Sequence, residues 1–187
     1  MEKDIYKSAV KLKQVIPYTG IPVIITILLV LHNNVIDEFK LLWYVLIIIF
    51  GYIAAYLDFS TKRIPNMLVI IMLSAWVITM VPRLFYNIND AVDILRDSAL
   101  GFAVGGGLFF LIYLISRKGI GGGDVKFMAA AGLFLGFSGT FSAMLYGSII
   151  AGLVAVVLLI LKKIGRKDSM PLVPFLYLGI LVTIFFR

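Results

Sequence analysis

The chain has 187 residues, of which 61% are hydrophobic and 14% are charged, and its mean hydropathy is +1.05. A soluble domain of this size needs a largely polar exterior and cannot bury so much apolar surface, so this class is excluded. With no cysteine and a single histidine, His32, the chain also lacks the side chains for disulfides, thiolate metal sites or a His-rich metal site. We therefore expect an all-α, polytopic membrane protein without a metal or another cofactor, although a site of carboxylates alone stays open.

Apolar stretches recur along the whole chain. A helix rises about 1.5 Å per residue and the hydrocarbon layer is about 30 Å thick, so most of these stretches can cross it. Lipid offers no hydrogen-bond partner to the backbone, so each span must be helical. The stretch 125–138 is short and rich in Ala and Gly, and we expect its helix to begin in the preceding glycine loop or to be shielded by neighbours. The sequence predicts about seven spans: 16–36, 41–57, 65–82, 98–116, 125–138, 139–161 and 170–186.

Basic residues divide unequally between the two sides of the predicted bundle. With the N-terminus inside, 13 of the 17 Lys and Arg residues fall on the inner side, and every inner loop contributes. Cytosolic loops carry such an excess, so the bias predicts a cytosolic N-terminus. Topology and contact with anionic lipid then explain the net charge of +7 better than nucleic-acid binding does. The basic residues on the outer side are Lys40, Arg83, Arg96 and Arg187.

Two of the ten acidic residues stand where an apolar segment begins or ends. Asp58 closes the second predicted span in YIAAYLDFSTKRIPN, and Asp124 opens the fifth after GIGGG. The second span runs inward and the fifth runs outward, so both carboxylates are expected at the cytosolic edge, where the bundle can bring them together. The other eight are interpreted as solvated charges of tails and polar loops: Glu2, Asp4, Asp37, Glu38, Asp90, Asp93, Asp97 and Asp168.

A meeting of Asp58 and Asp124 predicts acid–base chemistry. Two carboxylates at hydrogen-bond distance in a partly dehydrated site do not both ionise easily, so the pair holds a single proton. The ionised carboxylate can deprotonate a water while the protonated one donates to a carbonyl oxygen. This is the chemistry of aspartic proteases, which requires no metal, cysteine or histidine. Taken alone, Asp58 is explained at least as well as a helix-end charge beside Lys62 and Arg63.

The glycines before Asp124 are interpreted as part of the same site. Because glycine has no side chain, this run permits unusual backbone dihedrals and the close approach of an extended substrate peptide. A flexible loop explains it equally well. Lys126 is interpreted as a topology determinant or as a partner for a carboxylate. Small-residue helix packing, rather than chemistry, is expected at Gly101, Gly105, Gly106, Gly107, Gly132 and Gly136.

Together these segments resemble the prepilin and preflagellin peptidases, membrane aspartic proteases with a GxGD motif. LDFSTKRIPN is similar to the family's aspartate followed by a basic pair and Ile-Pro-Asn, and GxGD stands within GIGGGDVKFMAAAGLFLG. MPLVPFLYLG resembles the family's Pro-x-x-Pro-Phe segment, with Val173 where a glycine is usual. The resemblance covers about 41–187, a six-helix core, and makes 1–40 an added tail and span of a single domain, 1–187.

The resemblance implies an endopeptidase that removes a short basic leader from type IV pilin-like or archaellin-like precursors at the cytosolic face of the membrane. Many bacterial relatives also methylate the new N-terminus with an extra domain that often carries paired CxxC motifs. Because this chain has no cysteine and about 15 residues before its first span, we expect cleavage without methylation. The implied catalytic pair is Asp58 and Asp124, and the implied supporting residues are Gly119, Gly121, Gly122, Gly123, Lys126 and Arg63.

Other classes of membrane protein stay open as alternatives. Presenilin-like GxGD proteases carry Tyr-Asp on one span and Pro-Ala-Leu on a later one, whereas Asp58 follows Leu57 and Pro-Ala-Leu is missing. A transporter or channel also places carboxylates in a helical bundle, but nearer to the bilayer midplane or on broken helices in related halves. A non-enzymatic scaffold leaves Asp124 and its glycines unexplained.

Overall fold

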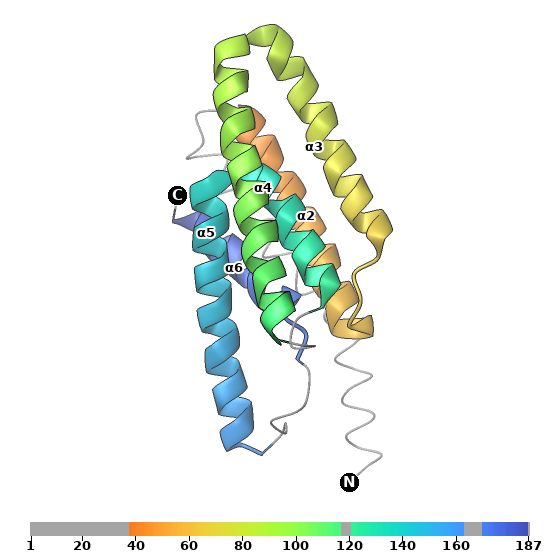
Figure 1. The fold of residues 1–187 in the computed structure, drawn as a ribbon, viewed down its shortest axis with the longest axis vertical. Coiled ribbons are helices and arrows are strands. Elements are labelled where there is room, and N and C mark those ends of the chain that lie inside the picture. Colours follow the sequence, from red (N-terminus) through yellow and green to blue (C-terminus); the bar gives the residue numbers. More distant parts are fainter. Residues whose placement is uncertain (1–37, 117–120, 163–169, 187) are drawn as a thin grey trace.

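The computed structural model describes residues 38–116, 121–162 and 170–186, and the predicted span 16–36 lies outside them. Within these ranges the chain forms helices joined by short connections, and no strand. Figure 1 shows successive helices running in opposite directions along one long axis. The helices are α2 Glu38–Thr61, α3 Asn66–Tyr86, α4 Ile88–Ser116, α5 Gly122–Ile160 and α6 Val173–Phe185.

Four of these helices, α2 to α5, are long and apolar enough to cross a membrane, whereas α6 is apolar but has 13 residues, about 20 Å. The predicted stretches 41–57, 65–82 and 98–116 correspond to α2, α3 and α4, and 170–186 corresponds to α6. The chain is therefore a helical, multi-pass membrane protein, as its composition predicts. The count of about seven spans stays a prediction.

The helix α5 folds back on itself at Gly136. This residue has φ 68° and ψ −176°, a conformation that is not helical and that glycine adopts far more readily than other residues. Figure 1 shows the two legs, turquoise and then cyan to blue, running in opposite directions from this point. The legs correspond to the separate stretches 125–138 and 139–161 of the sequence. The helix packing expected for Gly136 is present, because a Cβ on Gly101 of α4 would overlap its backbone, and its positive φ makes it a turn residue as well.

Asp97 stabilises this reversal from the neighbouring helix. It lies in α4, and its Oδ1 accepts a hydrogen bond of 2.9 Å from the main-chain N–H of Phe137, while its carboxylate packs against Gly136. Asp97 is exposed, as predicted for a solvated charge, but it lies in a helix and has a partner, so its interpretation as a loop charge is wrong. The first leg of α5 has just ended there, so the N–H of Phe137 has no partner within that leg. Asp90 and Asp93 also lie in α4 rather than in a loop, although both are exposed.

Glycines allow α4 and the first leg of α5 to pack with their backbones in contact. A Cβ on Gly101 would overlap the carbonyl oxygen of Gly132, and a Cβ on Gly105 would overlap that of Met128. Gly106 packs in the same way on Ala129. The predicted small-residue packing is confirmed at these positions. Gly107 differs, because a Cβ there would meet nothing within 4 Å in the described part of the chain.

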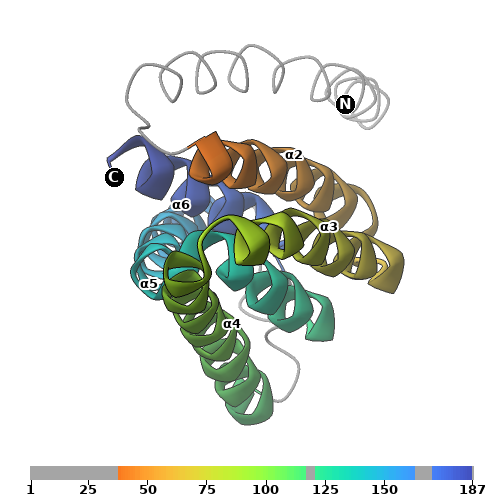
Figure 2. The same cartoon turned by 90° about the horizontal axis from the view of Figure 1, so that it is seen from above.

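The core lies where α2, α6 and both legs of α5 meet. Ile47, Phe127, Met128, Leu176 and Ile180 are fully buried there, and Figure 2 shows α6 between α2 and α5. This packing gathers the end of α2 and the starts of α5 and α6 at one end of the bundle, the lower end in Figure 1. Asp58 and Asp124 lie on two of these helix ends.

Candidate active site

Asp58 occupies the last turn of α2 and is 5% exposed. The helix continues to Thr61 and ends where Lys62 takes a left-handed conformation, φ 52°. The N–H of Lys62 still donates to the carbonyl of Asp58 at 2.8 Å, which closes this turn. A non-glycine residue with positive φ turns the chain sharply at a helix end. Asp58 is thereby kept inside the helix while the following loop turns away from it.

The start of α6 holds the Asp58 carboxylate. The main-chain N–H of Val173 donates to Oδ2 of Asp58 at 3.0 Å, and the N–H of Leu172 lies close enough to interact as well. Free N–H groups at the start of a helix favour a carboxylate at this place. The family resemblance leads one to expect a glycine in place of Val173, yet the main-chain donor does not depend on the side chain. Pattern reasoning noted Val173 but did not predict this bond.

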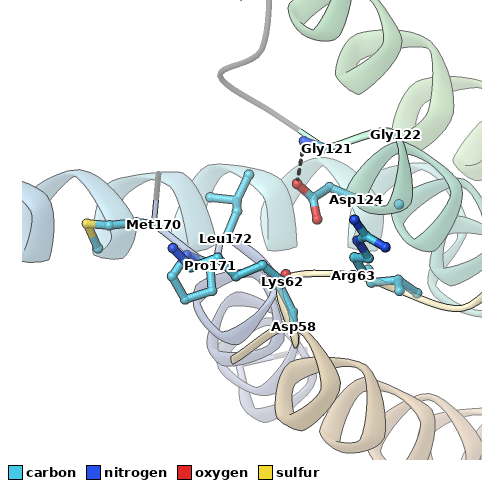
Figure 3. A pocket seen from close by; sticks show the side chains of 11 residues that line it. Asp58, Lys62, Arg63, Gly121, Gly122, Asp124, Met170, Pro171 and Leu172 are labelled. Carbon is cyan, nitrogen blue, oxygen red and sulfur yellow. Dashed lines mark hydrogen bonds between the residues drawn. The ribbon is translucent and has the colours of Figure 1, made fainter. Parts of the chain in front are cut away.

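Asp124 is held by its own turn at the start of α5. It is 8% exposed, and its Oδ2 accepts a hydrogen bond of 3.0 Å from the N–H of Gly121, while its own N–H donates to the carbonyl of Gly121 at 3.0 Å. This is a capping box, in which the first and fourth residues of the turn satisfy each other. In Figure 3 the second oxygen of Asp124 points away from Gly121 and into the cavity.

The described glycines of the motif have ordinary dihedrals, and one of them, Gly123, serves packing. Among the described glycines only Gly136 has a positive φ, so the prediction of unusual backbone dihedrals is wrong for Gly121, Gly122 and Gly123. Gly119 lies outside the described residues. A Cβ on Gly123 would lie 3.1 Å from the Cβ of Ile64, so the loop between α2 and α3 rests on this glycine. The segment that closely approaches this glycine is therefore the protein's own loop, whereas the sequence predicted a substrate peptide in this role.

One cavity of about 440 Å³ contains both carboxylates (Figure 3). Its lining falls into three parts: the acids Asp58 and Asp124 with the glycine turn, two cations, and an apolar wall. The two carboxylates are close enough to interact electrostatically, and Lys62 interacts in the same way with Asp58. The cations are Lys62 and Arg63, the turn is Gly121–Gly123, and the wall consists of Ile64, Met170, Pro171 and Leu172.

Arg63 and Lys126, the two basic residues predicted to support the site, lie in different places. Arg63 lines the cavity, whereas Lys126 is not among its lining residues. Lys126 Nζ instead donates to Oδ1 of Asn66 at 2.9 Å. Its partner is thus an amide, so the alternative of a carboxylate partner is wrong. Sequence reasoning missed Asn66 as a contact of the GxGD segment, because 60 residues separate the two.

The arrangement can perform acid–base chemistry on a neutral substrate. Two buried carboxylates in one cavity, one of them protonated, can supply a base and an acid at the same time. Main-chain donors hold both side chains, so neither requires another side chain to orient it. Among the described residues no group of three or more His, Asp or Glu side chains gathers as metal ligands would.

The fold and the cavity together define a helical membrane protein with paired carboxylates at one end of its bundle. The sequence profile of the type IV leader peptidase family matches residues 45–156, which include Asp58 and Asp124. The match spans more than half of the chain, and the chain belongs to this family. It is therefore a membrane peptidase of the kind that acts on prepilin-type substrates. No curated protein and no solved structure matches the chain.

Proposed function

We propose that the chain is an aspartic endopeptidase in which Asp58 and Asp124 form the catalytic pair. The observation that carries this proposal is their burial in one cavity, each with Oδ2 bound to a main-chain N–H from a helix start. Buried carboxylates in a bundle are usually paired with cations, whereas these two share one cavity and are close enough to interact with each other. The cavity also has room for a stretch of extended peptide.

The proposed reaction divides the two acid–base roles between the carboxylates. The ionised one takes a proton from a water, whose oxygen attacks the scissile carbonyl carbon, while the protonated one gives its proton to the carbonyl oxygen. The tetrahedral diol then collapses: the carboxylate that gave its proton takes one back from a diol hydroxyl, the C–N bond breaks, and the leaving nitrogen takes up the proton removed from water. The pair is left with a single proton on the same carboxylate as at the start and is ready for another turnover.

We propose that the substrates are type IV pilin-like or archaellin-like precursors, cleaved between a short basic leader and a hydrophobic helix at the cytosolic face. The distribution of basic residues supports this orientation. Lys62, Arg63, Lys126 and Lys162 lie at the end of the bundle that carries the cavity, whereas Lys40, Arg83 and Arg96 lie toward the other end. A peptide bond at the start of a substrate's membrane helix would reach the cavity at the cytosolic edge of the membrane.

We also propose that each leg of α5 and the short α6 cross the bilayer. The alternating direction of α2, α3, α4 and the two legs supports this topology, which with 16–36 makes about seven spans. The first leg and α6 are each shorter than the hydrocarbon is thick. Both are sheltered by neighbouring helices, so their ends do not have to reach the lipid interface by themselves.

The decisive experiment is cleavage of a pilin-like precursor by the purified protein in detergent, with the new N-terminus sequenced. Asp58→Asn and Asp124→Asn should each lower the rate at least about a hundredfold, because neither variant can shuttle a proton between two carboxylates. Asp93→Asn is the matched control, since Asp93 is an exposed carboxylate of α4 and should be dispensable. Cleavage by either site variant at the normal rate would refute the catalytic pair. The mass of the product shows whether its amino group stays unmethylated, as the sequence predicts.

A further inference from the structure

A side-chain hydrogen bond joins the two segments that carry the aspartates. Lys126 Nζ donates to Oδ1 of Asn66 at 2.9 Å. Lys126 lies two residues beyond Asp124 in the first turns of α5, and Asn66 is the first residue of α3, just after the loop that follows Asp58. Neither side chain lines the cavity, and both are exposed. The bond is therefore beside the proposed catalytic pair without being part of it.

The surrounding contacts show why this bond bears on the separation of the carboxylates. Asp58 is bound to the start of α6, whereas the hydrogen bond that Asp124 accepts within the described residues comes from its own turn. The relative position of the two acids therefore depends on how the start of α5 meets the loop between α2 and α3. Next to Asp124 that junction includes Gly123 against Ile64 and Lys126 with Asn66. The first contact limits how close the two segments come, and the second is a directional polar bond between them that adds to the apolar packing of α5 against α2 and α3.

The chemistry of the hydrogen bond between Lys126 and Asn66 is suited to holding the two segments together. A hydrogen bond from an ammonium group is stronger than one between neutral partners, and the amide of Asn66 sits on a rigid helix start. An amide acceptor also leaves the positive charge of Lys126 unneutralised, so the bond adds no further carboxylate near the site. A lysine that served only membrane topology would need no defined partner.

We propose that Lys126 and Asn66 are positioning residues that hold Asp124 at its working distance from Asp58. The inference rests on the proposed function, because it assigns the bond a role in aspartic protease chemistry. Neither residue is proposed to touch the substrate. Loss of the bond should therefore lower kcat and leave KM nearly unchanged.

The shape of the pH profile provides a readout that a purely structural role would not change. Two close carboxylates titrate in two steps because each charge opposes the other, and the interval between the steps shrinks as the acids move apart. A peptidase that needs one proton on the two carboxylates is active only at pH values between the two titration steps. Weaker coupling between the carboxylates therefore narrows the pH range of activity. The charged groups that face the pair within the described residues are Lys62 and Arg63 of the loop, while the start of α6 contributes none. Variants at Lys126 and Asn66 leave both cations in place.

The test compares Lys126→Met, Asn66→Leu, the double variant and Lys126→Arg, all with full-length protein in detergent. Each single loss should lower kcat about tenfold, as removal of a charge-assisted hydrogen bond predicts, and should narrow the pH profile. The kcat of the double variant should be no lower than that of the less active single variant, because each single substitution already removes the same bond. Lys126→Arg keeps a charged donor and should stay within about threefold of the original rate.

Lys162→Met is the matched control, because it removes one exposed lysine at the same end of the bundle. If Lys126→Met and Lys162→Met lowered kcat equally, the positioning role would be overturned in favour of a simple contribution of charge. Additive losses of kcat in the double variant would overturn it as well. Should Lys126→Met fail to fold, Asn66→Leu tests the same bond from its other side. Full activity of both, together with loss of activity in Asp58→Asn, would refute this inference while the proposed function stands. Activity of Asp58→Asn itself would refute the function.

Discussion

The main-chain N–H of Val173 donates a hydrogen bond to Oδ2 of Asp58, although 115 residues separate them in the chain. The bond places the start of α6 directly on a buried carboxylate at the end of α2. Because the donor belongs to the backbone, its position depends on the course of the chain and not on the identity of the side chain. Val173 itself is fully buried, so its side chain packs in the core while its N–H serves the site.

Val173→Gly separates these two contributions. We expect the variant to keep its cleavage activity, because the N–H donor remains. It should lose about 1–3 kcal/mol of stability, because a buried side chain is replaced by a cavity. Thermal unfolding in detergent and initial cleavage rates measure the two effects. A large loss of kcat with an unchanged unfolding temperature would show that the side chain, and not the backbone, matters to the reaction.

Gly123→Ala tests the contact between the GxGD turn and the loop after α2. The new methyl group would stand 3.1 Å from the Cβ of Ile64, so the loop must shift by a few tenths of an ångström, and we expect a several-fold fall in cleavage rate. Ile64→Gly in the same chain should restore part of the rate, because it removes the Cβ that the new methyl group meets. The control is Gly122→Ala, because a Cβ on Gly122 would meet nothing within 4 Å among the described residues. Equal losses in both alanine variants would contradict the packing explanation.

Gly136→Ala should prevent the reversal of α5. Alanine is strained at φ 68° and ψ −176°, and its methyl group would overlap the carboxylate of Asp97. We expect a loss of about 2–4 kcal/mol, seen as poor recovery of folded protein or as a much lower unfolding temperature. Gly107→Ala, at an unobstructed helical position of α4, should be neutral or slightly stabilising. An unchanged unfolding temperature of Gly136→Ala would mean that the turn is not required.

The shared proton predicts a bell-shaped dependence of cleavage on pH. At low pH both carboxylates are protonated and no base is available; at high pH both are ionised and no acid is available. Activity should therefore fall on both sides of an optimum, and kcat/KM measured across pH in the free enzyme reports the two limits. A rate that rises or falls in one direction only would indicate that a single group titrates and that the two acids do not act as a pair.

The absence of cysteine makes the proposed orientation straightforward to test. Single cysteines at Asn89, in the first turn of α4, and at Lys162, at the end of α5, lie toward opposite ends of the bundle. A membrane-impermeant maleimide should label Asn89→Cys in intact cells and Lys162→Cys only after permeabilisation. The reverse pattern would overturn the cytosolic assignment of the cavity while leaving the fold unchanged.

The sequence by itself determined the class of the protein and singled out its two unusual acids. Hydropathy records how deep each segment lies, and helices are the only way to satisfy the backbone in lipid, so composition and segment length sufficed for a helical membrane protein. Asp58 and Asp124 stood out because each interrupts an apolar run at a segment end. Family motifs in the same two places led to the peptidase family, which the profile match confirms.

Only the tertiary structure decided what these residues touch. Hydropathy carries no information on which helices are neighbours or how each is rotated, so the bond from Val173 to Asp58 and the bond from Lys126 to Asn66 were not foreseen. Asp97 was misinterpreted for the same reason, since its partner lies 40 residues away on another helix. The glycine turn was expected to need unusual dihedrals, whereas its glycines keep ordinary ones and Gly123 admits the backbone of a neighbouring loop. Depth in a membrane is a local property of sequence, but contact between helices depends on packing over the whole bundle.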